Sequence, residues 1–233
     1  SPQTRIIAEH YAAKYAGKKI VVGVDSCQRL SGLGVKFDAF ERFLMEDPRA
    51  GRGVVLIQKA IRNGSRKDDE AHTSSELQQM VSTINNRFYK RAQSSSLLLP
   101  PSGAGSSRTG SPTTKMQPGG SPAQLAIDYE EVPALSLVHR VALWLVADVF
   151  LSTALREGLN LTPMEYIYCR RHVPHAGCVI TSDFALTASL LSGALKVNPY
   201  NVNSIVDALQ VAIFMKDKDA NSRRLRDLKF ITS

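Results

Sequence analysis

The sequence predicts an α/β fold in which helices cover both faces of one open, mostly parallel sheet. Apolar, β-branched runs such as residues 19–25 (KIVVGVD) are typical of strands buried on both faces of a parallel sheet. These runs alternate with segments whose apolar residues recur at helical spacing, as expected of repeated β-α units. With 233 residues, of which 43% are hydrophobic, the chain is long enough to bury one sizeable core.

The first half of the chain contains two predicted strand–helix units. Residues 19–25 and 54–57 are continuous apolar runs that predict buried strands. Each run precedes a segment, 36–46 and 70–91, in which apolar side chains recur at three- and four-residue steps. Consecutive units of this kind predict neighbouring parallel strands that are joined by crossover helices.

The second half continues the alternation of strands and helices. Pro163 falls in the first turn of a predicted helix, where proline is favoured, and Asn201 or Asn203 is the expected N-cap of another. Ligands of such sheets bind beyond the carboxyl ends of the strands. The predicted elements are a helix at 136–147, a strand at 148–152, a helix at 162–170, a strand at 178–181, a helix at 184–191, a strand at 194–198 and a helix at 202–215.

A low-complexity segment separates the two halves. Residues 93–122 (QSSSLLLPPSGAGSSRTGSPTTKMQPGGSP) are dominated by Ser, Pro, Gly and Thr and contain no acidic residue. Such a composition buries too little apolar surface to offset the entropy lost on ordering. We expect a disordered insertion in a surface loop rather than a linker, because the preceding residues resemble an incomplete α/β half. Residues 1–233 are therefore predicted to form a single domain.

Composition and charge narrow the function classes. Lys and Arg number 29 against 21 Asp and Glu, a net charge of +8. Because the basic clusters are short, mixed with acids and not interleaved with aromatic residues, they favour solvated helix faces over a nucleic-acid partner. Three widely spaced cysteines predict neither a disulfide framework nor a zinc site, and we expect no metal and no cofactor.

The sequence also bears on the compartment. No apolar run reaches the roughly 18–20 residues that span a bilayer, so we expect no membrane contact. The opening residues, SPQTR, resemble neither a secretory signal nor a native start. We therefore expect a cytoplasmic domain that has been cut from a longer protein.

The turn after the first strand is the first candidate site. Residues 24–34 (VDSCQRLSGLG) place glycines between a strand and a helix, where backbone N–H groups can surround a phosphate. The glycine spacing matches neither a P-loop nor a complete dinucleotide-binding motif. By itself, the turn fits a plain strand-to-helix connection equally well.

Two further candidate segments follow later strands. In residues 154–166 (ALREGLNLTPMEY), Glu157 lies on a loop and Glu165 lies about one turn into the next helix. A loop carboxylate can accept hydrogen bonds from vicinal hydroxyls and a helix carboxylate can bind a ribose diol, although each alone also fits a solvated surface charge. Residues 193–200 (GALKVNPY) form a short strand that ends in Asn-Pro.

Together, these segments resemble the C-terminal half of the trehalose-6-phosphate synthases, retaining glycosyltransferases built from two Rossmann-like domains (the GT-B fold). KIVVGVD with the following Gly32 is similar to the family's first strand and phosphate turn. REGLNLTPMEY at 156–166 is similar to the family signature R-D/E-G-x-N-L-x-x-x-E-Y, and GALKVNPYNV at 193–202 to its G-A-x-x-V-N-P segment. The resemblance covers residues 5–92 and 128–216. It implies the Rossmann-like donor-binding half of an enzyme that transfers glucose from UDP-glucose to glucose 6-phosphate without a bound metal.

The resemblance implies roles for individual residues of the signature loop. Glu157 stands where the family's acidic residue, usually Asp, contacts hydroxyls of the donor glucose. Asn160, Leu161 and Thr162 stand where backbone groups meet the glucose and the diphosphate. Glu165 stands where a carboxylate binds the uridine ribose.

The phosphate turn departs from the family pattern V-D-R-L-D-Y-T-K-G. Ser26 replaces the arginine and Ser31 the lysine that neutralise the donor diphosphate in the family. Loss of one such group typically costs about 3–4 kcal/mol in the transition state, and two losses lower the rate roughly 10⁴-fold or more. Serine donates a hydrogen bond but brings no charge. Arg29, or Arg62 or Arg66 after the second strand, could compensate.

Three interpretations follow. We favour a degenerate synthase-like domain, a catalytically weakened or inactive pseudoenzyme with a regulatory, scaffolding or sugar-sensing role. The alternatives are an active glucosyltransferase domain in which Arg29 compensates, and an unrelated α/β domain that binds an anionic ligand or nucleic acid. The expected partners are UDP-glucose or UDP, an acceptor half preceding Ser1 and, as in eukaryotic members, a fused phosphatase-like domain. We expect the fragment alone to be inactive.

Overall fold

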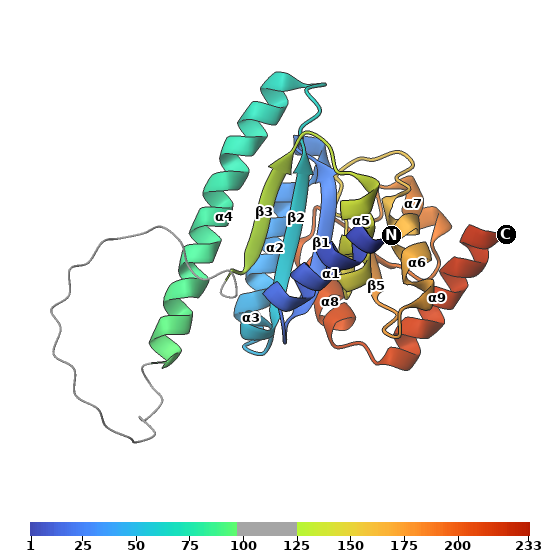
Figure 1. Cartoon of the computed structure of the whole chain (residues 1–233). Helices are drawn as coiled ribbons and strands as arrows, with labels where there is room; N and C mark the ends of the chain where they lie inside the picture. The colour runs from blue at the N-terminus through green and yellow to red at the C-terminus, as the bar shows by residue number, and fades with distance from the viewer. Residues whose placement is uncertain (97–124) are drawn as a thin grey trace, which may run out of the picture.

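Six parallel strands form one sheet in the part of the chain that the structure describes. The computed structural model describes residues 1–96 and 125–233. The strands lie in the order β3-β2-β1-β4-β5-β6 (Figure 1), and every neighbouring pair is parallel. This order confirms the predicted open parallel sheet. The strands are β1 (Lys19–Ser26), β2 (Val54–Ile61), β3 (Ile127–Val132), β4 (Val149–Leu151), β5 (Cys178–Ser182) and β6 (Leu195–Val197).

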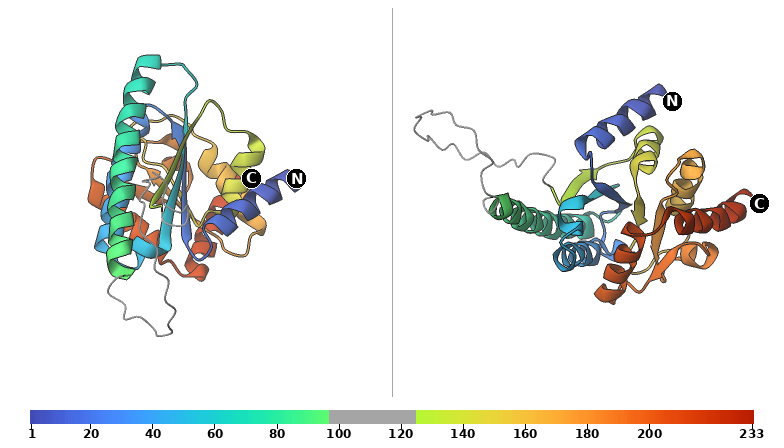
Figure 2. Two further views of the ribbon diagram at one scale, coloured as in Figure 1. Left: turned by 60° about the vertical axis from the view of Figure 1, so that its left-hand side comes forward. Right: turned by 90° about the horizontal axis from the view of Figure 1, so that it is seen from below.

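Helices cover both faces of the sheet, as predicted. They are α1 (Pro2–Lys14), α2 (Leu33–Glu46), α3 (Ala50–Gly53), α4 (Lys67–Ser96), α5 (Leu137–Val146), α6 (Thr162–Cys169), α7 (Leu186–Leu190), α8 (Val202–Ile213) and α9 (Asp217–Thr232). Figure 2 shows α2, α4 and α8 on one face and α1, α5 and α6 on the other. Each face has its own buried cluster: Val21 of β1 joins the first, whereas Ile20 and Val22 join the second. This division follows from the alternation of side chains along a strand.

The strand–helix units predicted from the sequence are present with small shifts of their ends. α2 begins at Leu33 rather than at Lys36, because Gly32 adopts a left-handed conformation (φ 68°) that ends a short 3₁₀ turn and starts the helix. α8 has the predicted cap, since the Asn201 side chain accepts a hydrogen bond from the Asn203 N–H.

α1, α3 and β3 were not predicted from the sequence. α4 also continues to Ser96, so the backbone of residues 93–96, where the insertion was expected to begin, is helical. The remainder of the predicted insertion, residues 97–122, lies outside the described residues. Within the described ranges, no helix combines the length and the apolar character that crossing a membrane requires.

A side chain of α4 binds the outer side of β3. On the inner side, Leu56 of β2 donates its N–H to the Ala126 carbonyl. On the outer side, Asn85 donates to the Ile127 carbonyl at 2.8 Å and accepts from the Ile127 N–H at 2.9 Å. The same Asn85 oxygen also accepts from the Ala126 N–H at 3.0 Å. One amide therefore satisfies the backbone groups at the start of this strand.

Candidate functional site

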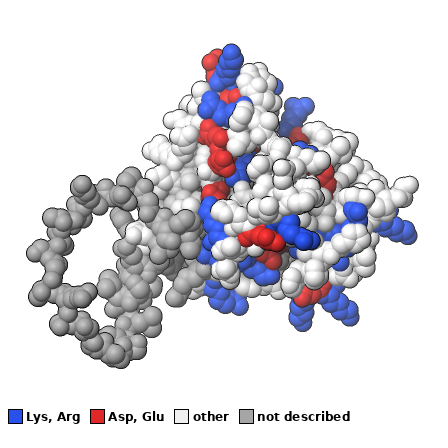
Figure 3. All heavy atoms as spheres, in the orientation of Figure 1, with Lys and Arg blue, Asp and Glu red and all other residues white. Residues whose placement is uncertain are grey.

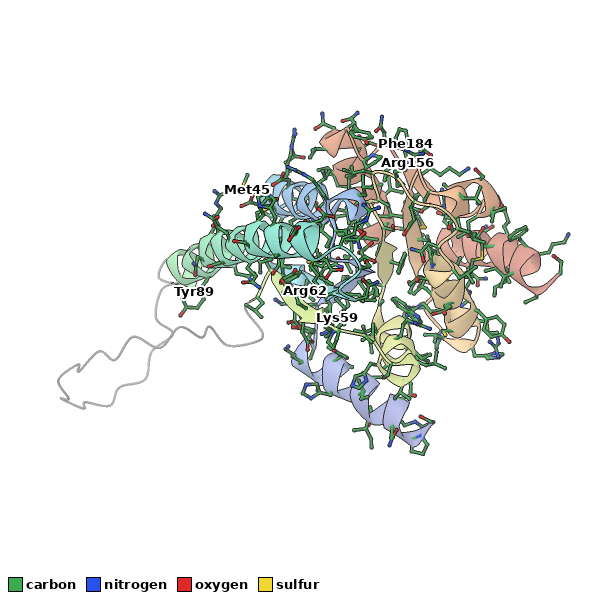
Figure 4. The ribbon with its side chains drawn as sticks, turned by 90° about the horizontal axis from the view of Figure 1, so that it is seen from above. Met45, Lys59, Arg62, Tyr89, Arg156 and Phe184 are labelled. Atoms are coloured by element: carbon green, nitrogen blue, oxygen red, sulfur yellow. The ribbon has the colours of Figure 1, made fainter. Side chains whose placement is uncertain are left out.

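A pocket of about 260 Å³ opens at the carboxyl ends of β1 and β2, beside the loop that follows β4. The strand order reverses between β1 and β4, the place where α/β sheets of this kind bind ligands. Figure 4 looks down on this end of the sheet. The pocket is lined by Val24, Asp25, Ser26, Ile61, Arg140, Glu157, Leu159, Asn160, Leu161 and Thr162.

The loop from Glu157 to Thr162 is fixed by its own hydrogen bonds. Asn160 donates from its side chain to Glu157 Oε1 at 3.1 Å and accepts from the Thr162 N–H at 2.9 Å. The Asn160 N–H donates to the hydroxyl of Thr187, a fully buried residue of α7, and the Thr187 hydroxyl donates back to the Asn160 carbonyl. Two of the three backbone N–H groups that were expected to meet a diphosphate are therefore already bonded within the fold.

A second anchor holds the start of this loop. The Glu157 N–H donates to the Phe184 carbonyl at 3.2 Å, and the Leu186 N–H donates to the Gly158 carbonyl at 3.3 Å. Arg156 and Phe184 consequently lie close together in Figure 4. The Glu157 side chain is thus presented to the pocket from a rigid loop.

Glu157 has an unusual electrostatic environment. Burial raises the pKa of Glu157 above its ordinary value, and the nearby Asp25 carboxylate raises it further. The hydrogen bond from Asn160 and the charge of Lys36 oppose this rise. A carboxyl with a raised pKa, in a pocket at the carboxyl ends of the strands, is typical of binding or catalytic sites.

A buried polar network supports the floor of the pocket, and sequence reasoning missed its members. Lys36 of α2, which is fully buried, binds Asp25 at 2.5 Å and donates to the Gln58 side-chain oxygen at 3.0 Å. Gln58 donates in turn to Asp25 at 3.0 Å. Gly23 makes room for this network, because a Cβ there would lie 2.2 Å from Gln58 Oε1 and 2.6 Å from Lys36 Nζ.

The residues of the predicted phosphate turn do not all reach the pocket. Ser26 lines it, whereas Arg29 and Gly32 line a separate hollow of about 180 Å³ at the start of α2. Gly32 lies against the segment that follows β4, since a Cβ there would lie 2.1 Å from the Thr153 carbonyl oxygen. Ser31 follows Arg29 in the same 3₁₀ turn. The structure therefore brings Ser26, but not Arg29, to the signature loop.

Arg62, one of the other two predicted substitutes for the missing cations, is engaged elsewhere. Arg62 pairs with Glu131 at 3.2 Å and lines a different pocket beside α4. Glu131 is held by hydrogen bonds from Ser74 and Tyr129 as well. Arg62 therefore belongs to a network at the carboxyl ends of β2 and β3.

Glu165, the predicted ribose ligand, is paired with a basic residue that the sequence did not single out. Arg140 of α5 lies beside Glu165 of α6, with Nε 2.7 Å from Oε2 and Nη2 3.0 Å from Oε1. Arg140 lines the pocket, whereas Glu165 is absent from the described residues that line it. Arg140 thus both lines the pocket and pairs with the Glu165 carboxylate.

Two further side chains near the candidate segments belong to the core. Cys27 of the phosphate turn is fully buried, because its side chain packs into the core beneath α2 and α4. Trp144 of α5 is fully buried as well. Among the described residues, no group of three or more His, Cys, Asp or Glu side chains is placed to hold a metal ion.

Comparisons with known proteins identify the sequences that this chain resembles. The family model described as Glycosyltransferase family 20 matches residues 2–97 and 132–233. The chain is 28% identical over 219 residues to a probable alpha,alpha-trehalose-phosphate synthase (UDP-forming) 3 of Arabidopsis thaliana. It is 30% identical over 211 residues to the alpha,alpha-trehalose-phosphate synthase (UDP-forming) of Schizosaccharomyces pombe. These matches cover 94% and 90% of this chain but only 24% and 34% of the two relatives.

Solved structures of similar proteins have the same fold. A Burkholderia xenovorans alpha,alpha-trehalose-phosphate synthase (UDP-forming) in complex with glucose-6-phosphate aligns with a TM-score of 0.78 at 22% identity, over 99% of this chain and 45% of that one. The N-terminal domain of Candida albicans trehalose-6-phosphate phosphatase aligns with a TM-score of 0.76 at 22% identity, over 98% and 41%. At these identities the likeness concerns the fold.

Proposed function

Because the chain belongs to glycosyltransferase family 20, we propose that it is the donor-binding half of a trehalose-phosphate-synthase-like enzyme with a degenerate diphosphate site. The relatives at 28% and 30% identity are UDP-forming synthases, so UDP-glucose or UDP is the proposed ligand. The pocket beside β1 and β4, with Ser26 and the loop 157–162 in its wall, supports this assignment.

The loop residues suit the recognition of a sugar. Glu157 would accept hydrogen bonds from the hydroxyls of the donor glucose, and Asn160 fixes the Glu157 carboxylate at 3.1 Å. The Leu161 backbone would face the diphosphate, since the N–H groups of Asn160 and Thr162 are bonded internally. Glu165 would bind the ribose once its carboxylate is released from Arg140.

The charge balance around the pocket is the observation that carries the proposal of a weakened site. Asp25 is neutralised by Lys36, and Glu165 by Arg140. Glu157 makes no ion pair among the described residues, so the five groups together carry one net negative charge when all are ionised. A diphosphate brings further negative charge, and each missing charge-assisted hydrogen bond typically withholds about 1.5–3 kcal/mol.

Two alternatives receive less support from the geometry. Compensation by Arg29 would require this residue to leave the hollow at the start of α2 for the neighbouring pocket. Nucleic-acid binding would call for a continuous basic surface, but acidic and basic side chains are interspersed on the face that Figure 3 shows. We therefore retain the degenerate synthase-like domain, with sugar sensing as its non-enzymatic form.

The same similarity suggests partners within a longer polypeptide. Since the chain covers 24% and 34% of the two synthase relatives, we propose that an acceptor-binding half completes the active site. The fold of the Candida albicans phosphatase N-terminal domain supports a phosphatase-like domain as a further fusion partner.

Calorimetric titration of UDP and UDP-glucose into the 233-residue chain tests the proposal. We expect the wild-type chain to bind UDP only at millimolar concentration. Ser26→Arg combined with Ser31→Lys should tighten UDP binding at least tenfold, about 1.4 kcal/mol, because it restores both diphosphate cations. The loss of this gain in high salt would mark it as electrostatic.

A matched control separates a local effect from a change in overall charge. Ser222→Arg with Ser75→Lys adds the same two charges at exposed positions of α9 and α4 and should leave UDP affinity unchanged. Micromolar UDP binding by the wild-type chain that is lost in Glu165→Ala would contradict the degenerate site and favour an active one.

A further inference from the structure

The ion pair between Arg140 and Glu165 engages both carboxylate oxygens. Nε of Arg140 lies 2.7 Å from Oε2, and Nη2 lies 3.0 Å from Oε1. Nη2 donates a hydrogen bond to Oε1, whereas Nε and Oε2 form an ion-pair contact without hydrogen-bond geometry, and these two atoms are shielded from solvent. A hydrogen bond between a guanidinium and a carboxylate is charge-assisted and therefore stronger than one between neutral groups.

The packing of α5 against α6 holds the two partners in this position. One turn beyond Arg140, the Trp144 ring packs edge-to-face against the Tyr166 ring with centroids 6.0 Å apart. Both aromatic residues are fully buried or nearly so, and Phe150 of β4 completes the cluster. Because the backbone beneath each partner is fixed, forming the pair orders little more than the two side chains.

The position of the pair relative to the pocket has a chemical consequence. Arg140 is the one cation among the described residues that line the pocket, and its partner Glu165 is absent from that lining. A ribose diol binds a carboxylate through two hydroxyl donors, which are neutral. These hydroxyls would have to displace the charged Arg140 side chain, which donates to Oε1 and lies against Oε2, from the same carboxylate.

We propose that Arg140 determines the ligand specificity of the pocket by competing with a ribose diol for Glu165. This inference rests on the proposed nucleotide-sugar function and deepens it. While Arg140 holds Glu165, a nucleoside loses its ribose contact, and recognition falls to the loop at Glu157 and Asn160. The pocket then favours the hydroxyls of an uncharged sugar over those of a nucleotide.

The opposite role for Arg140 makes an opposite prediction. If the Arg140 guanidinium instead served as a cation for the diphosphate, its removal would weaken UDP binding and leave uridine binding unchanged. Comparing a charged ligand, UDP, with an uncharged one, uridine, therefore distinguishes competition of Arg140 for Glu165 from recruitment of Arg140 by the diphosphate.

The test is titration of uridine and 2′-deoxyuridine into the full chain and its Arg140→Leu variant. We expect Arg140→Leu to bind uridine about tenfold more tightly than wild type, because Glu165 becomes free. The affinity for 2′-deoxyuridine, which lacks the diol, should not change. The gain should disappear in Arg140→Leu combined with Glu165→Gln, and Arg140→Lys should fall between wild type and Arg140→Leu.

Arg42→Leu is the matched control. Arg42 pairs with Glu46 at 2.7 Å on α2, at an exposed position, and is absent from the described residues that line the pocket. Its replacement should leave uridine affinity unaltered. Arg140→Gln, which keeps most of the aliphatic stem, replaces Arg140→Leu if the latter does not fold by circular dichroism.

The outcomes separate this inference from the proposed function. Equal uridine affinity in wild type and Arg140→Leu, together with UDP binding by both, overturns the competition but leaves the donor-binding function standing. Weaker UDP binding in Arg140→Leu overturns it in favour of recruitment. Absence of UDP and uridine binding in every variant overturns both.

Discussion

At the scale of single residues, Glu157 illustrates a conflict between stability and binding. Its carboxyl is held by Asn160 and faces Asp25 across the pocket floor. Because burial and Asp25 raise the pKa of Glu157, ionisation of this carboxyl opposes folding. The same ionised carboxyl is the group that would accept hydrogen bonds from a sugar.

Glu157→Gln should therefore stabilise the chain while weakening sugar binding. Glutamine keeps the oxygen that accepts from Asn160 but carries no charge. The advantage should be absent below pH 4.5, the ordinary value for glutamate, where both states are protonated. It should grow as the pH rises from 4.5 through the raised pKa, so that the Tm of Glu157→Gln at pH 7 exceeds that of the wild-type chain. Thermal unfolding at pH 4 and pH 7 measures this, and equal Tm values at pH 7 would contradict it.

The sequence could identify Glu157 and Asn160 but not their supports. Lys36 falls within an amphipathic helix, where a lysine is normally expected at the surface. It is instead fully buried against Asp25 and Gln58. Nothing local to α2 indicates this, because the partners come from β1 and β2 and meet only when the sheet forms.

At the scale of elements, the pattern of apolar residues was sufficient to predict a strand or helix wherever most of that element is buried. β1 and β2 were predicted because six of the eight residues of β1 and seven of the eight residues of β2 are buried. β3 has one fully buried residue, Ile127. Its polar sequence, IDYEEV, lacks the apolar run from which a strand is predicted. α1 was missed for the same reason, since only Thr4 and Ala8 are buried in it.

The last helix, α9, is joined to the loop before β6 by a short hydrogen bond. Gly193 donates its N–H to Asp227 Oδ1 at 2.6 Å, and Arg223 donates to the Gly193 carbonyl at 3.0 Å. A Cβ at Gly193 would lie 2.3 Å from the Arg223 carbonyl oxygen, so the glycine permits this close approach. Asp227 is buried, and burial raises the pKa of its carboxyl.

Substitutions at Asp227 should separate the hydrogen bond from the charge. Asp227→Ala leaves the buried Gly193 N–H without a partner and should cost about 1–3 kcal/mol of unfolding free energy. Asp227→Asn keeps an acceptor oxygen and should remain close to wild type. Urea unfolding of both variants, with Ser222→Ala on the exposed side of α9 as control, measures the difference. Equal losses in the two Asp227 variants would show that the charge, not the hydrogen bond, is required.

At the scale of the whole molecule, the pocket joins parts that are distant in the sequence. Asp25 and Ser26 come from β1, whereas Arg140 and Glu157 come from segments beyond residue 125. The resemblance to a family aligned the loop residues one by one, but it could not indicate Arg140. That residue gains its importance only from the packing of α5 on α6, which sets it against Glu165.

The two ends of the candidate site also differ in how far sequence predicted them. The signature loop lies beside the ends of β1 and β2, at the edge where ligands of parallel sheets bind. The phosphate turn divides instead, with Ser26 in the pocket and Arg29 in the hollow at the start of α2. The direction of the chain after Ser26 decides this division, and residue spacing alone does not fix it.

The Asn85 side chain covers part of the outer edge of the sheet, at the start of β3. By binding both backbone groups of Ile127, it occupies hydrogen-bonding positions that could otherwise template a strand from another molecule, the usual route to edge-to-edge aggregation. Asn85→Ala should therefore make the chain self-associate at high concentration, as rising light scattering would reveal, whereas Asn86→Ala at an exposed position should not. A strictly monomeric Asn85→Ala would contradict this. If Asn85→Ala does self-associate, the solubility of the chain depends on one amide. That amide is remote from the pocket and acts independently of whether the pocket binds a sugar nucleotide.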